Sequence, residues 1–286
     1  MDIRQAFAYS VQNLCRSERS GCGNGEDSLA MKQFELAGVV FDVDVHGAGP
    51  PMLYLHPEHY GQLHTPFLNS LAESWTVYAP RHPGFDGRRP PANFRQVSDI
   101  AYLYLDLLEC LDLDTVVVLG ASFGGWVALE MAVRDRARLC ALGLIAPLGV
   151  KLGGRDDRDF ADLSALPDDE AAACLFAGPL PDLGTFSQEE LIAVARDRQF
   201  LAYYGWKPYL HNPSLVRWLH RVKMPVHLMW GAADGFVAPS LGQGLADRLP
   251  DARLDILSGA GHYPQIECLD EMVAVLAAGP CASVGG

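Results

Sequence analysis

Residues 115–125 of the chain read TVVVLGASFGG. The β-branched run at 116–118 is typical of a strand, and the segment that follows the glycines is typical of a helix. A Gly-x-Ser-x-Gly sequence between a strand and a helix predicts a serine on a strained turn, with its hydroxyl pointing out from the sheet edge. Glycine is expected at positions 120 and 124 for a steric reason, because a Cβ on Gly120 or Gly124 would collide with the tight backbone of this turn. Ser122 is therefore a candidate nucleophile, and the alternative is a Gly/Ser turn that merely ends a strand.

A nucleophilic serine needs a base and an acid that orients the base, in the chain order Ser, Asp or Glu, His for this arrangement. Asp234 lies in the loop after the apolar run 226–230, which is predicted to be a buried strand. His262 lies in a Gly-rich loop after the alternating segment 252–257 and directly before a predicted helix. Each residue alone also fits a turn former or a packing residue. As an ordered set at strand ends, the three residues predict a catalytic triad.

The rest of the chain alternates between strand and helix patterns. Strands are expected at 32–37, 39–46, 51–56, 75–79, 115–120, 139–146, 225–230 and 252–257. Helices are expected near 62–73, 95–112, 124–135, 239–249 and 265–278. The first two strands are predicted to form a hairpin through Ala37 and Gly38. The later alternation predicts an α/β protein with a mostly parallel sheet.

Residues 147–223 interrupt this alternation. Short amphipathic helices are expected at 157–163, 168–176 and 187–204, each opened by Asp or Ser at a plausible cap. Four aromatic residues follow or end the last of them: Tyr203, Tyr204, Trp206 and Tyr209. Such rings predict a pocket for an apolar small-molecule substrate, although rings of this kind also join an insertion to the core.

These motifs resemble the α/β-hydrolase superfamily from about residue 34 to residue 278. The resemblance is carried by the segments 120–125, 230–234 with Pro239, and 259–264 with Glu267. It implies an α/β-hydrolase fold with a mostly parallel eight-stranded sheet, helices on both faces, a core at 32–146 and 224–279, and a helical lid inserted at 147–223. It also implies Ser122 as nucleophile, His262 as general base and Asp234 as its orienting acid. Serine at the turn differs from the aspartate of the dehalogenase and epoxide-hydrolase branches.

The loop after the third strand departs from the family pattern. The family usually has His-Gly there, whereas this chain has His56, Pro57 and Glu58. Proline has no N–H, so the implied oxyanion-hole donors are the backbone N–H groups of Glu58 and Phe123. The Glu58 side chain is expected either to point away to a structural partner or to act as an extra acid or base. His56 is expected to brace the loop and is a further candidate pocket residue.

Composition narrows the possible partners and compartment. The 22 basic and 35 acidic residues give a net charge of −13, which disfavours nucleic acid and anionic membranes. No apolar run approaches a membrane span and no signal peptide is readable, so a cytoplasmic protein is expected. The seven cysteines are expected to be reduced, and neither a cofactor nor a metal site is implied. Residues 1–31 are predicted to be a flexible leader, with Met31 a second candidate start, and residues 280–286 a loose tail.

Together these features predict a serine hydrolase that cleaves a small to medium apolar carboxylic ester or lactone through an acyl-enzyme on Ser122. A carbon–carbon bond hydrolase, or a non-hydrolytic cyclase or lyase, would share the triad and the lid. The unusual Pro57 and Glu58 favour such altered chemistry. A noncatalytic ligand-binding protein is the third alternative, and the complete triad argues against it.

Overall fold

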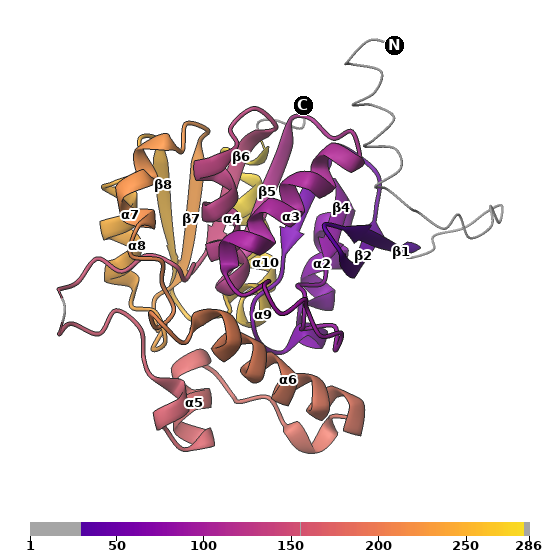
Figure 1. Ribbon diagram of the computed structural model, residues 1–286. Helices are drawn as coiled ribbons and strands as arrows, with labels where there is room; N and C mark the ends of the chain where they lie inside the picture. The colour runs from indigo at the N-terminus through magenta and orange to yellow at the C-terminus, as the bar shows by residue number, and fades with distance from the viewer. Residues whose placement is uncertain (1–29, 155, 283–286) are drawn as a thin grey trace, which may run out of the picture.

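The computed structural model describes residues 30–154 and 156–282. Within these residues, eight strands form one sheet in the order β1-β2-β4-β3-β5-β6-β7-β8 (Figure 1). Their bounds are β1 Ala30–Leu36, β2 Val39–His46, β3 Pro51–Leu55, β4 Thr76–Pro80, β5 Val116–Ala121, β6 Leu139–Ile145, β7 Val226–Gly231 and β8 Ala252–Leu257. The pairs from β4 through β8 are parallel, whereas β1 and β2 form an antiparallel hairpin and β2 pairs antiparallel with β4. The predicted fold class is confirmed.

Helices cover both faces of this sheet. Their bounds are α2 Thr65–Ala72, α3 Val97–Cys110, α4 Phe123–Arg134, α8 Pro239–Ala246, α9 Pro264–Glu267 and α10 Leu269–Ala277. All six residues of β5 are buried. Val116 and Val118 pack in the cluster that contains α3, α4 and α8, and Val117 and Leu119 pack in the cluster that contains α2 and α10. A continuous apolar run is what a strand needs when both of its faces are covered.

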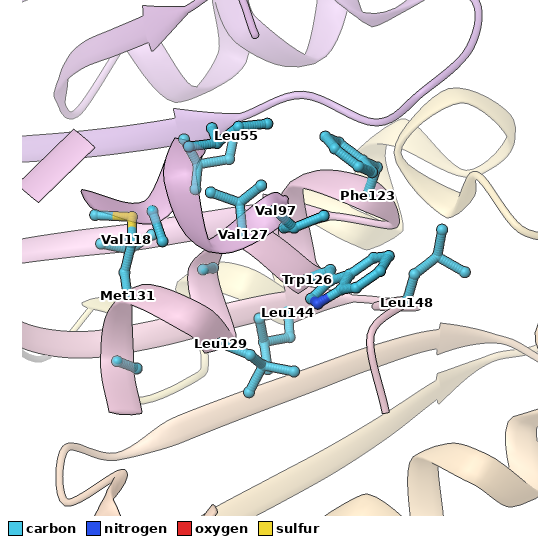
Figure 2. Close-up of a cluster of buried hydrophobic side chains, with 14 of the residues drawn as sticks. Leu55, Val97, Val118, Phe123, Trp126, Val127, Leu129, Met131, Leu144 and Leu148 are labelled. Carbon is cyan, nitrogen blue, oxygen red and sulfur yellow. The ribbon is translucent and has the colours of Figure 1, made fainter. Parts of the chain in front are cut away.

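The helix that follows the turn at Ser122, α4, is buried along almost its whole length. Figure 2 shows its side chains packed against residues from three strands and from α3; the labelled residues are Leu55, Val97, Val118, Phe123, Trp126, Val127, Leu129, Met131, Leu144 and Leu148. A helix held on all sides in this way fixes the position of its first residue. Phe123, which follows the predicted nucleophile, is that residue.

The segment between β6 and β7 carries the helices α5 Asp168–Leu175, α6 Gln188–Gly205 and α7 Leu215–Trp218, with the short turns η2 Leu163–Ala165, η3 Leu183–Thr185 and η4 Leu219–Arg221. In Figure 1, α5 and α6 lie at one end of the sheet. The carbonyl of Cys174 accepts from the N–H of Gly235, and the carbonyl of Leu175 accepts from the N–H of His262. The segment therefore contacts the loops that follow β7 and β8, at the carboxyl ends of these strands.

Three expected helices differ from the structure. Residues 157–163 do not form a helix; Phe160 instead makes an isolated β-bridge with Val237, so a long-range pairing overrides the local pattern. The helix expected at 265–278 is divided at Cys268, whose extended φ of −132° interrupts the helical path. The helix expected at 62–73 starts as the 3-10 turn η1, Gly61–His64, and becomes α-helical only from Thr65, just before Pro66.

The chain ends also need correction. The first strand begins at Ala30, two residues before the expected start, while residues 1–29 of the predicted leader lie outside the described residues. Residues 280–282 are not loose, because Cys281 is fully buried at a place where Gly143 leaves room for its sulfur. Cys110 is disulfide-bonded, so the expectation that every cysteine is reduced is wrong for this residue, which lies half-buried at the end of α3. No helix in the described ranges has the length and apolarity needed to cross a membrane.

Candidate active site

The candidate nucleophile lies on a strained turn between β5 and α4. Ser122 has φ 46° and ψ −109°, a conformation that L-residues rarely adopt. A Cβ on Gly120 would lie 2.5 Å from the carbonyl oxygen of Gly124. A Cβ on Gly124 would lie 2.6 Å from the carbonyl oxygen of His56. The steric reason predicted for both glycines is confirmed.

Three predicted catalytic side chains meet at the carboxyl ends of three strands. The Oγ of Ser122 lies 2.7 Å from Nε2 of His262, and Nδ1 of His262 lies 2.8 Å from Oδ2 of Asp234. All three residues are buried. With the Nδ1 proton donated to Asp234, Nε2 is left to accept the serine proton. The structure thus brings the three residues into the order and spacing of a nucleophile, a base and an orienting acid.

Backbone groups hold the acid and the base in place. The Oδ1 of Asp234 accepts from the N–H of Phe236 at 2.9 Å and from that of Val237 at 2.8 Å. The carboxylate of Glu267 accepts from the N–H of Gly261 at 2.6 Å and also from the N–H groups at 177 and 178, which follow α5. Glu267 therefore links the histidine loop to the segment between β6 and β7.

The Glu58 side chain points into this site. Its Oε2 accepts from the backbone N–H of Phe123 at 3.1 Å, and its Oε1 accepts from the Tyr263 hydroxyl at 2.8 Å. The same Oε1 lies 3.8 Å from Nε2 of His262. Glu58 is fully buried. Glu58 has a structural partner in Tyr263, as one of the two predictions expected, but its side chain does not point away from Ser122 and His262.

Burial and charge act in opposite directions on these groups. Burial alone would raise the pKa of the Glu58 carboxyl, but the imidazoles of His59 and His262 and a hydrogen bond from Ser122 hold this pKa below its ordinary value. Burial would lower the pKa of His262, yet the carboxylates of Asp234 and Glu58 raise it. The site therefore favours an imidazolium held between two carboxylates.

A cavity of about 160 Å³ is lined in part by Leu175, whose carbonyl accepts from the backbone N–H of His262. Its lining comes from the loop after β3, from α5 and from α6, and consists of His59, Tyr60, Leu163, Ser164, Leu166, Asp168, Ala171, Ala172, Leu175, Arg198, Leu201, Ala202, Gly205, Trp206, Tyr209 and Leu210. Arg198 and Asp168 form an ion pair of 2.9 Å and are both exposed. Most of the lining residues are apolar, while His59, Ser164 and the Arg198–Asp168 pair supply polar atoms, and the cavity is small enough for a compact ligand. Ser122 is not among the lining residues.

The predicted pocket residues divide into two groups. Trp206 and Tyr209 line the cavity. Tyr203 and Tyr204 do not line it, and their hydroxyls donate to the carbonyls of Phe94 and Pro83 at 3.0 Å each, which attaches α6 to the loop after β4.

His56 does not line the cavity either. Its Nδ1 lies 2.7 Å from the carbonyl of Pro57, and its Nε2 accepts from the N–H of His82 at 3.0 Å. Burial lowers the pKa of His56 to about 4, so the ring stays neutral and can accept this bond. These contacts join the loop after β3 to the loop after β4, as the bracing role expected for His56 requires.

Sequence reasoning did not identify three residues near the site. Tyr263 lies in the segment 259–264 that carried part of the family resemblance, but its contact with Glu58 could not be read from the sequence. Glu267 carried part of the family resemblance, but its contacts to three N–H groups could not be read from spacing. Asp197 lies on the buried stripe of α6 with Val194 and Leu201, where the helical period could have marked it as facing inward. Burial raises its pKa to about 8, and Glu58 adds to this rise.

No group of three or more His, Cys, Asp or Glu residues suited to hold a metal ion occurs in the ranges that the structure covers. The contacts from Ser122 through His262 to Asp234 suit nucleophilic catalysis by a serine with general base assistance.

Comparison with known proteins agrees with the fold. A profile of the alpha/beta hydrolase family matches residues 45–275. The chain is 25% identical over 262 residues to 2-hydroxymuconate semialdehyde hydrolase of Pseudomonas sp. strain CF600, covering 82% of this chain and 88% of the relative. It is 29% identical over 249 residues to pimeloyl-(acyl-carrier protein) methyl ester esterase of Aromatoleum aromaticum, covering 75% and 92%.

Among solved structures, the chain is similar to 2-hydroxy-6-oxo-6-phenylhexa-2,4-dienoate hydrolase of Rhodococcus sp. strain RHA1. The TM-score is 0.69 at 22% identity, with 88% of this chain and 99% of that structure covered. This likeness concerns the fold. With the family profile spanning most of the chain and the sheet order described above, the chain belongs to the alpha/beta hydrolase family, whose members are typically hydrolytic enzymes.

Proposed function

We propose that the chain is a serine hydrolase that cleaves a small to medium apolar carboxylic ester or lactone. The observation that carries this proposal is the buried relay from Ser122 through His262 to Asp234, with contacts of 2.7 and 2.8 Å. Relatives whose names describe an ester hydrolase and a semialdehyde hydrolase support hydrolytic chemistry. The small cavity between α5 and α6, most of whose lining residues are apolar, supports a compact substrate with an apolar part.

The first half of the reaction forms an acyl-enzyme. Neutral His262 accepts the proton of the Ser122 hydroxyl at Nε2 as Oγ attacks the substrate's carbonyl carbon. The carbonyl π electrons move to oxygen, and the N–H groups of Phe123 and Glu58 stabilise the resulting oxyanion. Collapse breaks the bond to the leaving alcohol, which takes the proton from His262.

The second half releases the acid. Water gives a proton to His262 and attacks the acyl carbon, and collapse returns the proton to Ser122. Asp234 remains ionised throughout, fixing the imidazole tautomer and stabilising the imidazolium. Water is the one co-reactant that these steps need besides the substrate.

A panel of p-nitrophenyl esters of increasing acyl length, assayed with the wild type and the Ser122→Ala variant, tests the proposal. Turnover that prefers short apolar acyl chains and disappears in Ser122→Ala supports it. Labelling of Ser122 by a fluorophosphonate probe tests the nucleophile independently of substrate. Ester turnover that persists in Ser122→Ala would exclude the acyl-enzyme route.

A second candidate is a carbon–carbon bond hydrolase or a non-hydrolytic lyase or cyclase. The specific observation in its favour is the Glu58 carboxylate beside Nε2 of His262, which adds a further acid or base that ester hydrolysis does not need. Strong fluorophosphonate labelling together with negligible turnover of every ester in the panel would favour this candidate.

A further inference from the structure

The contacts of the Glu58 carboxylate are those expected of a substrate oxyanion. Phe123 donates its backbone N–H to Oε2, and hydrogen bonds from the Ser122 side chain and from the backbone of Glu58 itself also act on the carboxyl. The N–H groups of Phe123 and Glu58 are the two oxyanion donors that the sequence implied. Tyr263 holds the other carboxylate oxygen.

Two anions cannot share these donors. An oxyanion needs N–H groups at about 2.7–3.1 Å, and Oε2 of Glu58 already lies 3.1 Å from the N–H of Phe123. A second negative oxygen in the same low-dielectric space would be strongly repelled by the first. With Glu58 in this position, the tetrahedral intermediate has no place for its charge.

The serine is also closed off from the neighbouring cavity. Ser122 is 1% exposed and Glu58 is not exposed at all. The cavity is lined by His59 and Tyr60, the two residues that follow Glu58 in the chain, but not by Ser122. A substrate in the cavity therefore reaches the nucleophile only after a side chain moves. Glu58 lies where that movement would also open the oxyanion hole.

We infer that the Glu58 carboxylate is a built-in occupant of the oxyanion hole, which the substrate's carbonyl oxygen must displace before Ser122 can react. This inference rests on the proposed serine chemistry. It assigns Glu58 a positioning role in which its departure both frees the two N–H donors and removes a negative charge from beside His262.

The titratable groups around Glu58 and His262 support a link between the position of Glu58 and the pKa of His262. The titratable groups that interact with Glu58 or His262 are Asp234, Tyr263, His56, His59, His64, Asp197 and Tyr209. Burial lowers the pKa of His59 and of His64 to about 4, so both are neutral near pH 7. Burial raises the pKa of Asp197 to about 8, so it is mostly protonated there. Because the Glu58 carboxylate helps to raise the pKa of His262 against its burial, displacing Glu58 lowers the affinity of this base for its proton.

The experiment compares fluorophosphonate labelling of Ser122 in the wild type, Glu58→Gln and Glu58→Ala, with Glu109→Gln, which changes an exposed glutamate on α3, as the charge-matched control. Glu58→Gln removes the charge, and Glu58→Ala also removes the side chain while keeping the backbone N–H. Both should be labelled roughly tenfold faster than the wild type, or more, because the oxyanion no longer competes with a carboxylate. Glu109→Gln should be labelled at the wild-type rate.

The pH dependence of labelling supplies a readout that a merely structural role would not change. In Glu58→Gln, the pH at which the labelling rate falls on the acid side should be lower by roughly one unit, because the variant lacks the negative charge that lies within about 4 Å of His262. Butylboronic acid, which forms a tetrahedral anion on serine, should bind at least about tenfold more tightly to the same variant. If Glu58 variants do not fold, Tyr263→Phe, which removes one contact to the carboxylate, should give the same directions of change.

Distinct results would overturn the inference. Folded Glu58 variants that are labelled more slowly than the wild type would show that the carboxylate assists the reaction, as the second candidate function requires. Rates, acid limbs and boronate affinities equal to those of the wild type would show that Glu58 does not occupy the hole in solution, while leaving the serine assignment intact. A lack of Ser122 labelling in the wild type and in every variant would refute the proposed function itself.

Discussion

Replacing Gly124 by alanine should damage both the stability and the reactivity of the protein. The added Cβ would lie 2.6 Å from the carbonyl oxygen of His56 and closer still to that of Leu55, whereas real Cβ atoms essentially never approach another atom within 3.0 Å. Both neighbours are backbone atoms, at the end of β3 and at the start of the loop that follows β3. The start of α4 and this loop must therefore separate by several tenths of an ångström to about 1 Å.

The size of both effects follows from that displacement. Overpacking of this kind costs about 3 kcal/mol, which corresponds to a fall in Tm of roughly 6–12 °C for a domain of this size. A misplacement of about 1 Å between Phe123 and Glu58, the two proposed oxyanion donors, should lower kcat about 100-fold. Thermal unfolding by circular dichroism and ester turnover would measure the two effects separately.

Gly61→Ala provides the matched control. Gly61 lies three residues after Glu58, at the end of the same loop, and a Cβ there would meet nothing within 4 Å. This variant should keep wild-type Tm and kcat. If Gly124→Ala also behaved like the wild type, the close approach between α4 and the end of β3 would not exist in solution, and the steric account of the turn at Ser122 would be wrong.

Three further predictions concern the triad, its pH dependence and the aromatic residues. Ser122→Ala and His262→Ala should each lower kcat by about 10⁴ or more, with the double variant little worse, because the residues act as a unit; additive losses would contradict this. Asp234 and Glu58 raise the pKa of His262 against its burial, so the neutral base should be lost as pH drops through an apparent pKa above 6.5, and kcat/KM should fall with it. A pH profile of kcat/KM that stays flat to pH 5 would identify another base. Tyr204→Ala removes a buried ring that contacts Phe123 and should cost around 3 kcal/mol of unfolding free energy. Trp206→Ala removes an exposed ring that lines the cavity and should raise KM with little change in kcat or Tm. If both variants lose only stability, the substrate does not bind in this cavity.

Much of the fold follows from local patterns. The strands were predicted within two residues at each end, because runs such as 116–118 are both β-branched and buried on two faces. The helix α6 begins where the sequence predicted, since the side chain of Ser187 accepts from the N–H of Glu190 and that of Glu190 accepts from the N–H of Ser187. The helix expected at 157–163 does not form, because Phe160 pairs with Val237 and local propensity contains no information about such a long-range contact.

The sequence by itself determined the order Ser122, Asp234, His262 and placed each residue after a strand, because parallel strands bring their carboxyl ends to one edge of the sheet. Only the tertiary structure decided where the Glu58 side chain points. Its partners Phe123 and Tyr263 lie 65 and 205 positions away along the chain. The tertiary structure likewise decided that Tyr204 contacts a carbonyl while Trp206 lines the cavity. The direction of a buried side chain depends on atoms supplied by distant segments, and no local period or motif encodes it.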